Sequence, residues 1–325
     1  MRHDQRVTPT IAVVIPSHNR PDALRGALAS VGAQTDPADE VIVVDDGSQP
    51  PVDPTTMPSL PGRLKVLRND VASGANAARN RGWRAASSQW VAFLDDDDRF
   101  KADKLARVRA AIAQHPDADV IYHPAWIRMV NEGVGYRSAP KDLGPVADPY
   151  RELLVGNYLG GTPMVTIRRS RLVEIDGFDE ALPSMQDYDM WLAMARHGVR
   201  FAYIDEPLTL CRYTTAGGGI STNVDKHFAA ARAIEAKHAQ GYAALTPQEL
   251  ARHQVFVLNV ATHRALMAGD SARARALQRE VLRTTRSPAA AANALVTMLG
   301  PRAAFRLRSM ISRGPTAARP QRGRG

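Results

Sequence analysis

A chain of 325 residues is long enough for one large domain with an appendage or for two domains, and its hydrophobic content of 44% excludes a wholly disordered protein. Its single cysteine, Cys211, excludes an intrachain disulfide and a cysteine-based zinc site, and it indicates a reducing compartment. The net charge of +9 is uneven, because residues 225–325 carry +12 whereas residues 1–224 carry −3. The basic excess therefore belongs to the C-terminal region.

Targeting and membrane-spanning segments are not expected. The apolar run Ile11–Ile15 is too short for a secretory signal and is followed by Pro16. No apolar stretch approaches the ~20 residues that a membrane span needs. The sequence therefore predicts a soluble, cytoplasmic protein.

The first half of the chain alternates short apolar runs with helical patterns. The run Ile11–Ile15 predicts a buried strand that ends at Pro16, and Pro21 opens a helix to about Ala33. A strand over Glu40–Val44 completes a βαβ unit, so we expect a parallel sheet with a right-handed connection. The pattern then predicts a loop over 49–62, a strand over 64–67, a helix from Gly74, a strand over 91–94, a helix over 101–114 and a strand over 120–123.

The second half becomes irregular and then helical. Gly, Pro and polar residues dominate 131–149, and further elements are expected as a strand over 164–167, a helix over 188–197, a strand over 201–204 and a mobile loop over 214–223. Residues 246–268 and 272–285 are predicted to form an antiparallel helical pair, because Asp270-Ser271 marks a helix start between them. One or two more helices are expected over 288–313, followed by a disordered tail over 314–325.

One stretch carries chemistry by itself: four apolar residues, 91–94, run directly into Asp95, Asp96, Asp97 and Asp98. Adjacent carboxylates repel each other, and oxygen-only ligands suit a hard divalent ion such as Mg²⁺ or Mn²⁺. The alternative is a solvated acidic face, with Asp98 capping the helix that follows.

Three strand ends carry polar groups: Pro16 to Asn19, Asp45-Asp46 and Asp95 to Asp98. In a parallel sheet these ends meet at one edge, where ligands bind. Asp46 is a candidate to accept hydrogen bonds from a base or ribose, or simply starts the Pro-rich loop. Arg79 is a candidate phosphate contact or a surface arginine.

These segments, in this order, resemble a known family. The matching residues are Val14 to Arg20, Val43 to Ser48, Gly74 to Gly82 with Ala78-Arg79-Asn80, Phe93 to Asp98, Gly177 to Glu180 and Gln186 to Leu192. The sequence over about 10–222 is similar to the inverting glycosyltransferases of family 2, which have the GT-A fold. The resemblance implies an α/β, Rossmann-like nucleotide-diphospho-sugar transferase domain over 1–224, with an α-helical C-terminal region over 225–313 outside it.

The resemblance also implies roles for individual residues. Asp46 matches a carboxylate that contacts the nucleobase, and Arg79 matches a basic residue near the donor. Asp95 and Asp97 match the ends of the Asp-x-Asp motif, which holds ribose and metal-bound diphosphate. Asp187 matches the general base. The other residues assigned to the donor site lie in the matching motifs and are Pro16, Asn19, Asn76 and Asp96.

The chain departs from the family at two positions. Gln186 stands where Glu is frequent, so one negative charge beside Asp187 is missing. Thr214 stands where many members have a histidine shortly after the arginine that corresponds to Arg212. The resemblance therefore does not extend to a metal or diphosphate contact in the loop that follows Arg212.

The expected activity is metal-dependent transfer of a sugar, of hexosyltransferase type. The donor is expected to be a UDP- or dTDP-sugar rather than a GDP-sugar, and the acceptor is a glycan, glycolipid or small molecule. A divalent ion stabilises the departing diphosphate, and Asp187 accepts the proton of the acceptor hydroxyl, unless it merely caps the helix that follows.

Two other functions stay open. A sugar nucleotidyltransferase is disfavoured because the first loop is Pro-Ser-His-Asn-Arg rather than Gly-rich. A non-catalytic nucleotide-binding or membrane-surface module is suggested by 301–313, where four arginines accompany Phe305, Leu307, Met310 and Ile311. Nucleic acid is not expected as a partner, because basic residues are not interleaved with aromatic ones. Peripheral contact with the inner face of a membrane, through the basic C-terminal helices, is a further expectation.

Overall fold

The computed structural model describes residues 8–215 and 222–285, together with single positions at 288, 291, 292, 296, 303, 306 and 307. The loop expected to be mobile over 214–223 is described only at its two ends. The helices expected over 288–313 lie almost entirely outside the described residues, and the tail over 314–325 lies wholly outside them.

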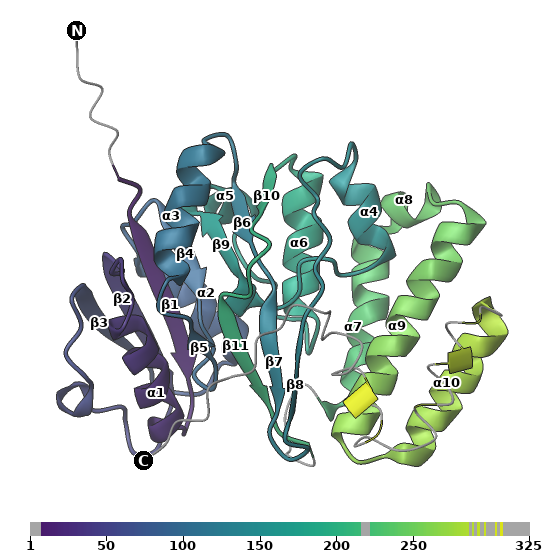
Figure 1. Ribbon diagram of the computed structural model, residues 1–325, viewed down its shortest axis with the longest axis horizontal. Helices are drawn as coiled ribbons and strands as arrows, with labels where there is room; N and C mark the ends of the chain where they lie inside the picture. Colours follow the sequence, from purple (N-terminus) through teal and green to yellow (C-terminus); the bar gives the residue numbers. More distant parts are fainter. Residues whose placement is uncertain are drawn as a thin grey trace, which may run out of the picture.

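The main sheet has seven strands in the described residues, in the order β10-β6-β9-β4-β1-β2-β3 (Figure 1). Their bounds are β1 Ile11–Ser17, β2 Glu40–Asp46, β3 Arg63–Asn69, β4 Trp90–Phe93, β6 Val120–Tyr122, β9 Val165–Arg168 and β10 Phe201–Tyr203. Since β1 pairs with β2 on one side and with β4 on the other, the strand order reverses at β1. This is the position at which open α/β sheets bind ligands.

The sheet is not wholly parallel, because β9 runs antiparallel to both of its neighbours, β4 and β6. The chain leaves β6 at Tyr122, and β9 begins opposite that same residue, since Tyr122 is paired with Val165. A strand that re-enters the sheet at the end where the chain left it must be antiparallel.

A smaller sheet lies beside the carboxyl end of β4. Its described strands are, in order, β5 Arg99–Phe100, β11 Thr209–Tyr213, β7 Ala125–Met129 and β8 Val134–Arg137. The sequence did not indicate this sheet, because its strands are short and Gly133 and Gly135 interrupt the apolar pattern of the β7–β8 hairpin.

The helices cover both faces of the main sheet. Their bounds are α1 Pro21–Gly32, α2 Ala75–Ala85, α3 Lys104–Gln114, α4 Pro149–Val155, α5 Arg169–Ile175, α6 Gln186–Arg196, α7 Val224–Lys237, α8 Ala239–Ala243, α9 Pro247–Met267 and α10 Ser271–Thr285, with 3₁₀ turns at Pro54–Thr56 and Thr162–Met164. Side chains alternate along β1, so Ile11, Val13 and Ile15 pack with α1 and α3, whereas Ala12 and Val14 pack with α2.

The prediction that Pro16 ends the first strand was wrong, because β1 continues to Ser17. The carbonyl of Val14 accepts a hydrogen bond from the Leu94 N–H, so Pro16 also faces the side of β4. Since β4 has already ended at Phe93, the missing N–H of Pro16 costs no ladder hydrogen bond.

Two helix starts also differ from the sequence prediction. Helix α3 begins at Lys104 rather than at 101, because Arg99–Phe100 pairs with β11; its N-cap is Asp103 rather than Asp98. Helix α6 begins at Gln186, two residues earlier than expected, after Met185 in a left-handed conformation.

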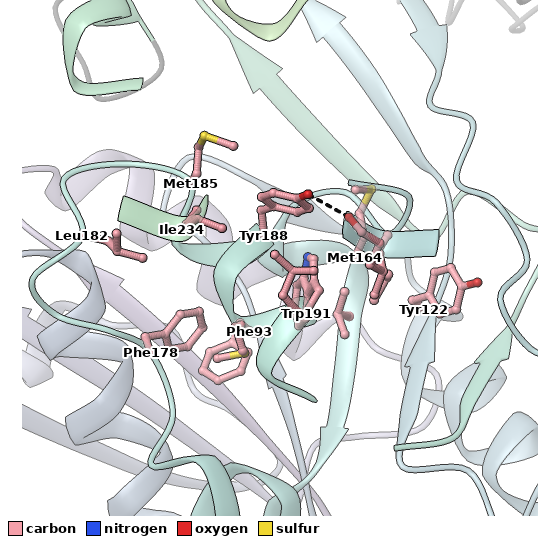
Figure 2. Close-up of a cluster of buried hydrophobic side chains, with 14 of the residues drawn as sticks. Phe93, Tyr122, Met164, Phe178, Leu182, Met185, Tyr188, Trp191 and Ile234 are labelled. Atoms are coloured by element: carbon pink, nitrogen blue, oxygen red, sulfur yellow. Dashed lines mark hydrogen bonds between the residues drawn. The ribbon is translucent and has the colours of Figure 1, made fainter. Parts of the chain in front are cut away.

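The C-terminal helices share a hydrophobic core with one face of the sheet. Figure 2 shows Tyr188 and Trp191 of α6 in the same buried cluster as Phe93 of β4, Phe178 and Ile234 of α7. The Tyr188 hydroxyl donates to the Leu153 carbonyl at 2.7 Å, which ties α6 to α4.

The predicted helical pair is present as α9 and α10, and α10 lies at the edge of the molecule farthest from the sheet (Figure 1). Among the described residues, no helix has both the length and the apolar composition required to cross a bilayer.

Candidate active site

The carboxyl ends of β1, β2 and β4 meet at one edge of the sheet. Ser17 at the end of β1 is in register with Asp45, and Val14 is in register with Phe93 two residues before Asp95. The three polar segments that the sequence singled out therefore lie together.

Asp95 to Asp98 form a turn, in which the Asp98 N–H donates to the Asp95 carbonyl at 3.0 Å. The turn exposes alternate side chains. The Asp95 and Asp97 side chains are 32% and 47% exposed, whereas Asp96 and Asp98 are buried. Asp96 accepts a hydrogen bond from the Ser17 hydroxyl at 2.9 Å, and Asp98 accepts one from the Arg212 N–H at 3.0 Å. Asp95 and Asp97 are thus the two carboxylates of this turn that are accessible to a ligand.

Two arginines compensate the exposed carboxylates. Arg79 of α2 lies 2.5 Å from Asp95, with its guanidinium over the Phe178 ring. Arg20, in the loop after β1, lies 3.0 Å from Asp97 and 3.3 Å from Asp96. Burial and the charge of Asp95 raise the pKa of Asp97, and the charge of Arg20 opposes this rise. Burial also raises the pKa of Asp96, where the hydrogen bond from Ser17 and the charge of Arg20 oppose the rise.

The oxygen donors of Asp95 and Asp97 fit a divalent cation such as Mg²⁺ or Mn²⁺, which one or two carboxylates commonly hold together with substrate phosphates. In the ranges that the structure describes, no group of three or more His, Cys, Asp and Glu side chains is placed to hold a metal ion. The metal assignment of Asp95 and Asp97 stays a prediction.

Asp46 and Asn19 organise the neighbouring loops. The Asp46 carboxylate accepts hydrogen bonds from the Asn69 side chain and from the Ser73 and Gly74 N–H groups, at 2.7, 2.9 and 2.8 Å, so it stabilises the chain leading into α2. Asn19 has a left-handed backbone, and its side-chain oxygen accepts from the Gln49 N–H at 2.7 Å. Their contact with a donor stays a prediction, as it does for Pro16.

Asn76 binds the turn over 177–180. Its side-chain amide donates to the Asp179 carbonyl at 2.8 Å, and Asn80 binds the Phe178 carbonyl in the same way. Asn76 is buried, and this contact fixes α2 against the chain that leads to α6. Its assignment to the donor site is untested.

Asp187 is the second residue of α6 rather than the residue before the helix, so it does not act as its N-cap. Its Oδ1 accepts a hydrogen bond from the Tyr188 N–H at 2.8 Å, and a Cβ added to Gly161 would lie 3.9 Å from its Oδ2. Burial raises the pKa of Asp187, whereas the charges of Arg264 and Arg79 lower it and that of Asp95 raises it. The carboxylate is thus electrostatically coupled to the Asp95–Arg79 pair.

Two charged residues of this region had no role in the sequence prediction. Arg20 lies in the motif after β1, and no local pattern marks its pairing with Asp97, which is 77 residues away in the chain. Arg264 lies on α9, outside every matching motif, yet its charge acts on the Asp187 carboxylate. Nothing in the local sequence marks Arg264, because only the packing of α9 brings it there.

Solved structures of S. aureus TarS share the fold of this chain. The chain is similar to residues 1–349 of S. aureus TarS in complex with UDP-GlcNAc, with a TM-score of 0.57 and 17% identity, over 93% of this chain and 90% of that one. A longer TarS structure matches with a TM-score of 0.54 and 18% identity, over 93% of this chain and 54% of that one. The fold is therefore that of the GT-A glycosyltransferases, extended by C-terminal helices.

Sequence comparison is more specific. Residues 12–170 match the family model described as glycosyl transferase family 2. An uncharacterized glycosyltransferase of Haemophilus influenzae is 37% identical over 214 residues, which cover 66% of this chain and 71% of the relative. The Escherichia coli UDP-Glc:alpha-D-GlcNAc-diphosphoundecaprenol beta-1,3-glucosyltransferase is 26% identical over 213 residues, 66% of this chain and 80% of the relative. The chain belongs to glycosyltransferase family 2, and it is an enzyme that transfers glycosyl groups.

Proposed function

We propose that the protein is a metal-dependent, inverting glycosyltransferase of hexosyltransferase type, which moves a sugar from a nucleotide diphosphate to an acceptor hydroxyl. The observation that carries this proposal is the Arg79–Asp95 ion pair at the carboxyl edge of the sheet, together with the effect of both charges on the buried Asp187. Membership of the family favours transfer over the nucleotidyltransferase and the non-catalytic module that the sequence left open.

Asp187 is the proposed general base. An acceptor hydroxyl has a high pKa, so it needs a carboxylate within hydrogen-bond reach as it attacks. The Tyr188 N–H orients one oxygen of Asp187, and the absence of a side chain on Gly161 leaves room beside the other. Direct displacement by such an acceptor inverts the anomeric carbon.

The proposed metal ligands are Asp97 and Asp95. A divalent cation bound there supplies positive charge for the departing diphosphate. Arg79, held against Asp95 and Phe178, adds a fixed positive charge beside it. Asp46, Pro16, Asn19, Asn76 and Asp96 complete the proposed donor site.

The proposed donor is a UDP-sugar, with a dTDP-sugar as the alternative. Two relatives support this choice, because TarS forms a complex with UDP-GlcNAc and the E. coli relative is named for UDP-Glc. The name of the E. coli relative also gives a diphosphoundecaprenol-linked sugar as its acceptor, which supports a glycolipid acceptor here.

We also propose that the enzyme works in the cytoplasm and touches the inner face of a membrane through its basic C-terminal region. The free, buried Cys211 fits a reducing compartment. Arg275, Arg279 and Arg283 are exposed on α10 at intervals of four residues, so they share one face of the helix.

The substitution Asp187→Asn tests the proposed base. Transfer should fall by about 100- to 10,000-fold, while binding of UDP with Mn²⁺, followed by thermal stabilisation, persists. Gln186→Glu is the matched control, because it changes the adjacent residue but keeps the base, and it should retain transfer. Transfer by the Asp187 variant at the wild-type rate would remove the assignment.

The donor and the stereochemistry are tested by a panel of nucleotide-sugars with and without Mn²⁺. We expect turnover of a UDP- or dTDP-sugar, and we expect a chelator of the metal to abolish this turnover. The sugar in the product should have the anomeric configuration opposite to that in the donor, as measured by NMR. Retention of configuration, or full turnover in a chelator, would contradict it.

A further inference from the structure

Asp97 is half-exposed and has a positive partner already in place. The Arg20 guanidinium lies 3.0 Å from its Oδ2 and 3.3 Å from the Asp96 Oδ1. Arg20 thus binds the same carboxylate that the proposed function assigns to the metal, and a guanidinium and a divalent cation at one carboxylate repel each other.

Arg20 and Arg79, which pair with the turn over 95–98, differ in how firmly they are held. Arg79 is 11% exposed, lies over the Phe178 ring and belongs to the buried α2 interface. Arg20 is 53% exposed and lies in the loop between β1 and α1. Since an exposed side chain loses little when it changes partner, Arg20 is the one that a ligand can draw away.

The alternative partner of Arg20 is chemically defined. A guanidinium binds phosphate oxygens in a bidentate manner as well as it binds a carboxylate. The diphosphate of the proposed donor accompanies the metal at Asp97, so it would arrive within the region that Arg20 already occupies.

We propose that Arg20 is an exchangeable counter-ion: it holds Asp97 in the free enzyme and moves to the donor diphosphate when the metal and the nucleotide bind. This inference rests on the proposed function of the site. It makes Arg20 a donor-binding residue and predicts that metal and nucleotide bind cooperatively, because the metal alone must displace Arg20 whereas the metal–nucleotide complex offers it a new partner.

The test measures Mn²⁺ binding directly, by the EPR signal of the free ion, on the full chain with and without UDP. Arg20→Gln should bind Mn²⁺ alone about fivefold more tightly than wild type, because the competing charge is gone. With saturating Mn²⁺, the same variant should bind UDP about tenfold or more weakly, because a charge-assisted contact is lost.

Two further variants serve as controls. Arg20→Lys keeps the charge and should bind Mn²⁺ alone as wild type does. Arg25→Gln removes a half-exposed arginine of α1 that is paired with Asp22, and it should change neither affinity.

The outcomes separate this inference from the function on which it rests. If wild type binds Mn²⁺ and UDP but Arg20→Gln binds Mn²⁺ no more tightly, or binds UDP with unchanged affinity, the exchange is wrong and the proposed function stands. If wild type binds no Mn²⁺ even with UDP, the metal-dependent function fails, and the exchange fails with it.

Discussion

Neighbouring aspartates have different tasks in this enzyme. In the turn after β4, Asp95 and Asp97 are partly exposed and pair with arginines, whereas Asp98 is buried and accepts a hydrogen bond from the Arg212 N–H of β11. The identity of the residues does not distinguish them, because the turn geometry alone directs each side chain.

This division predicts different effects of the same substitution. Asp97→Asn should weaken Mn²⁺ binding in the presence of UDP by about tenfold or more, because a charged oxygen donor is lost. Asp98→Asn should leave that affinity near the wild-type value, because its carboxylate points toward the smaller sheet. Mn²⁺ titration of both variants by EPR checks this, and equal losses would contradict the assignment of the turn.

At the scale of elements, α6 joins the catalytic region to the C-terminal helices. Asp187 lies near the acidic turn, and Asp189, two residues later, pairs with Lys237 of α7 at 2.7 Å. Arg151 of α4 pairs in a bidentate manner with Glu249 of α9, at 2.8 and 2.7 Å. The C-terminal helices are therefore positioned to influence Asp187, the proposed base.

Arg264 of α9 provides a test of that influence. The proposed base must be ionised to accept a proton, so activity falls as the pH drops through the pKa of Asp187. Burial raises this pKa, and the charge of Arg264 partly offsets the effect. Removing that charge in Arg264→Met should therefore raise the pKa of Asp187 further, and the acidic limb of kcat/KM should move to higher pH.

The control for this experiment lies on the same helix. Arg252 of α9 is 57% exposed and lies near Glu152 rather than near Asp187. Arg252→Gln should keep the wild-type pH profile, and an acidic limb that is identical in all three proteins would show that Arg264 does not influence the base.

At the scale of the whole molecule, charge is strongly segregated. Residues 271–325 contain twelve arginines and one glutamate, a net charge of +11, whereas the whole chain carries +9. Helix α10, which begins this segment, lies at the edge farthest from the sheet (Figure 1). Among the described residues, its exposed Arg275, Arg279 and Arg283 form no ion pair.

An anionic bilayer is the partner that we propose for this surface, so the protein should float with vesicles that contain phosphatidylglycerol but not with phosphatidylcholine alone. Replacing Arg275, Arg279 and Arg283 by Gln should weaken binding by up to about 100-fold, since each charge contributes about 1 kcal/mol at such a surface. Replacing Arg25, Arg63 and Arg200, which lie elsewhere, removes the same charge and should have little effect. Equal losses in the two triple variants would indicate a nonspecific charge effect.

Local pattern was enough for much of this protein. The apolar runs predicted β1, β2, β3, β4, β6 and β10 to within a few residues, and Pro21 marked the start of α1. The order of the strand ends was sufficient to predict that Asp46 and Asp95 lie at one edge of the sheet. Such features depend on periodicity and turn chemistry within about ten residues, and both can be read from the local sequence.

Only the tertiary structure decided the rest. Four features join segments that are distant in the chain. They are the antiparallel pairing of β9, the small sheet that includes the two-residue β5, the pairing of Arg20 with Asp97 and the effect of Arg264 on Asp187. No local pattern specifies such partners, because burial and charge compensation are properties of the packed molecule. The sequence determined which acids stand at the strand ends, and packing determined which cations meet them.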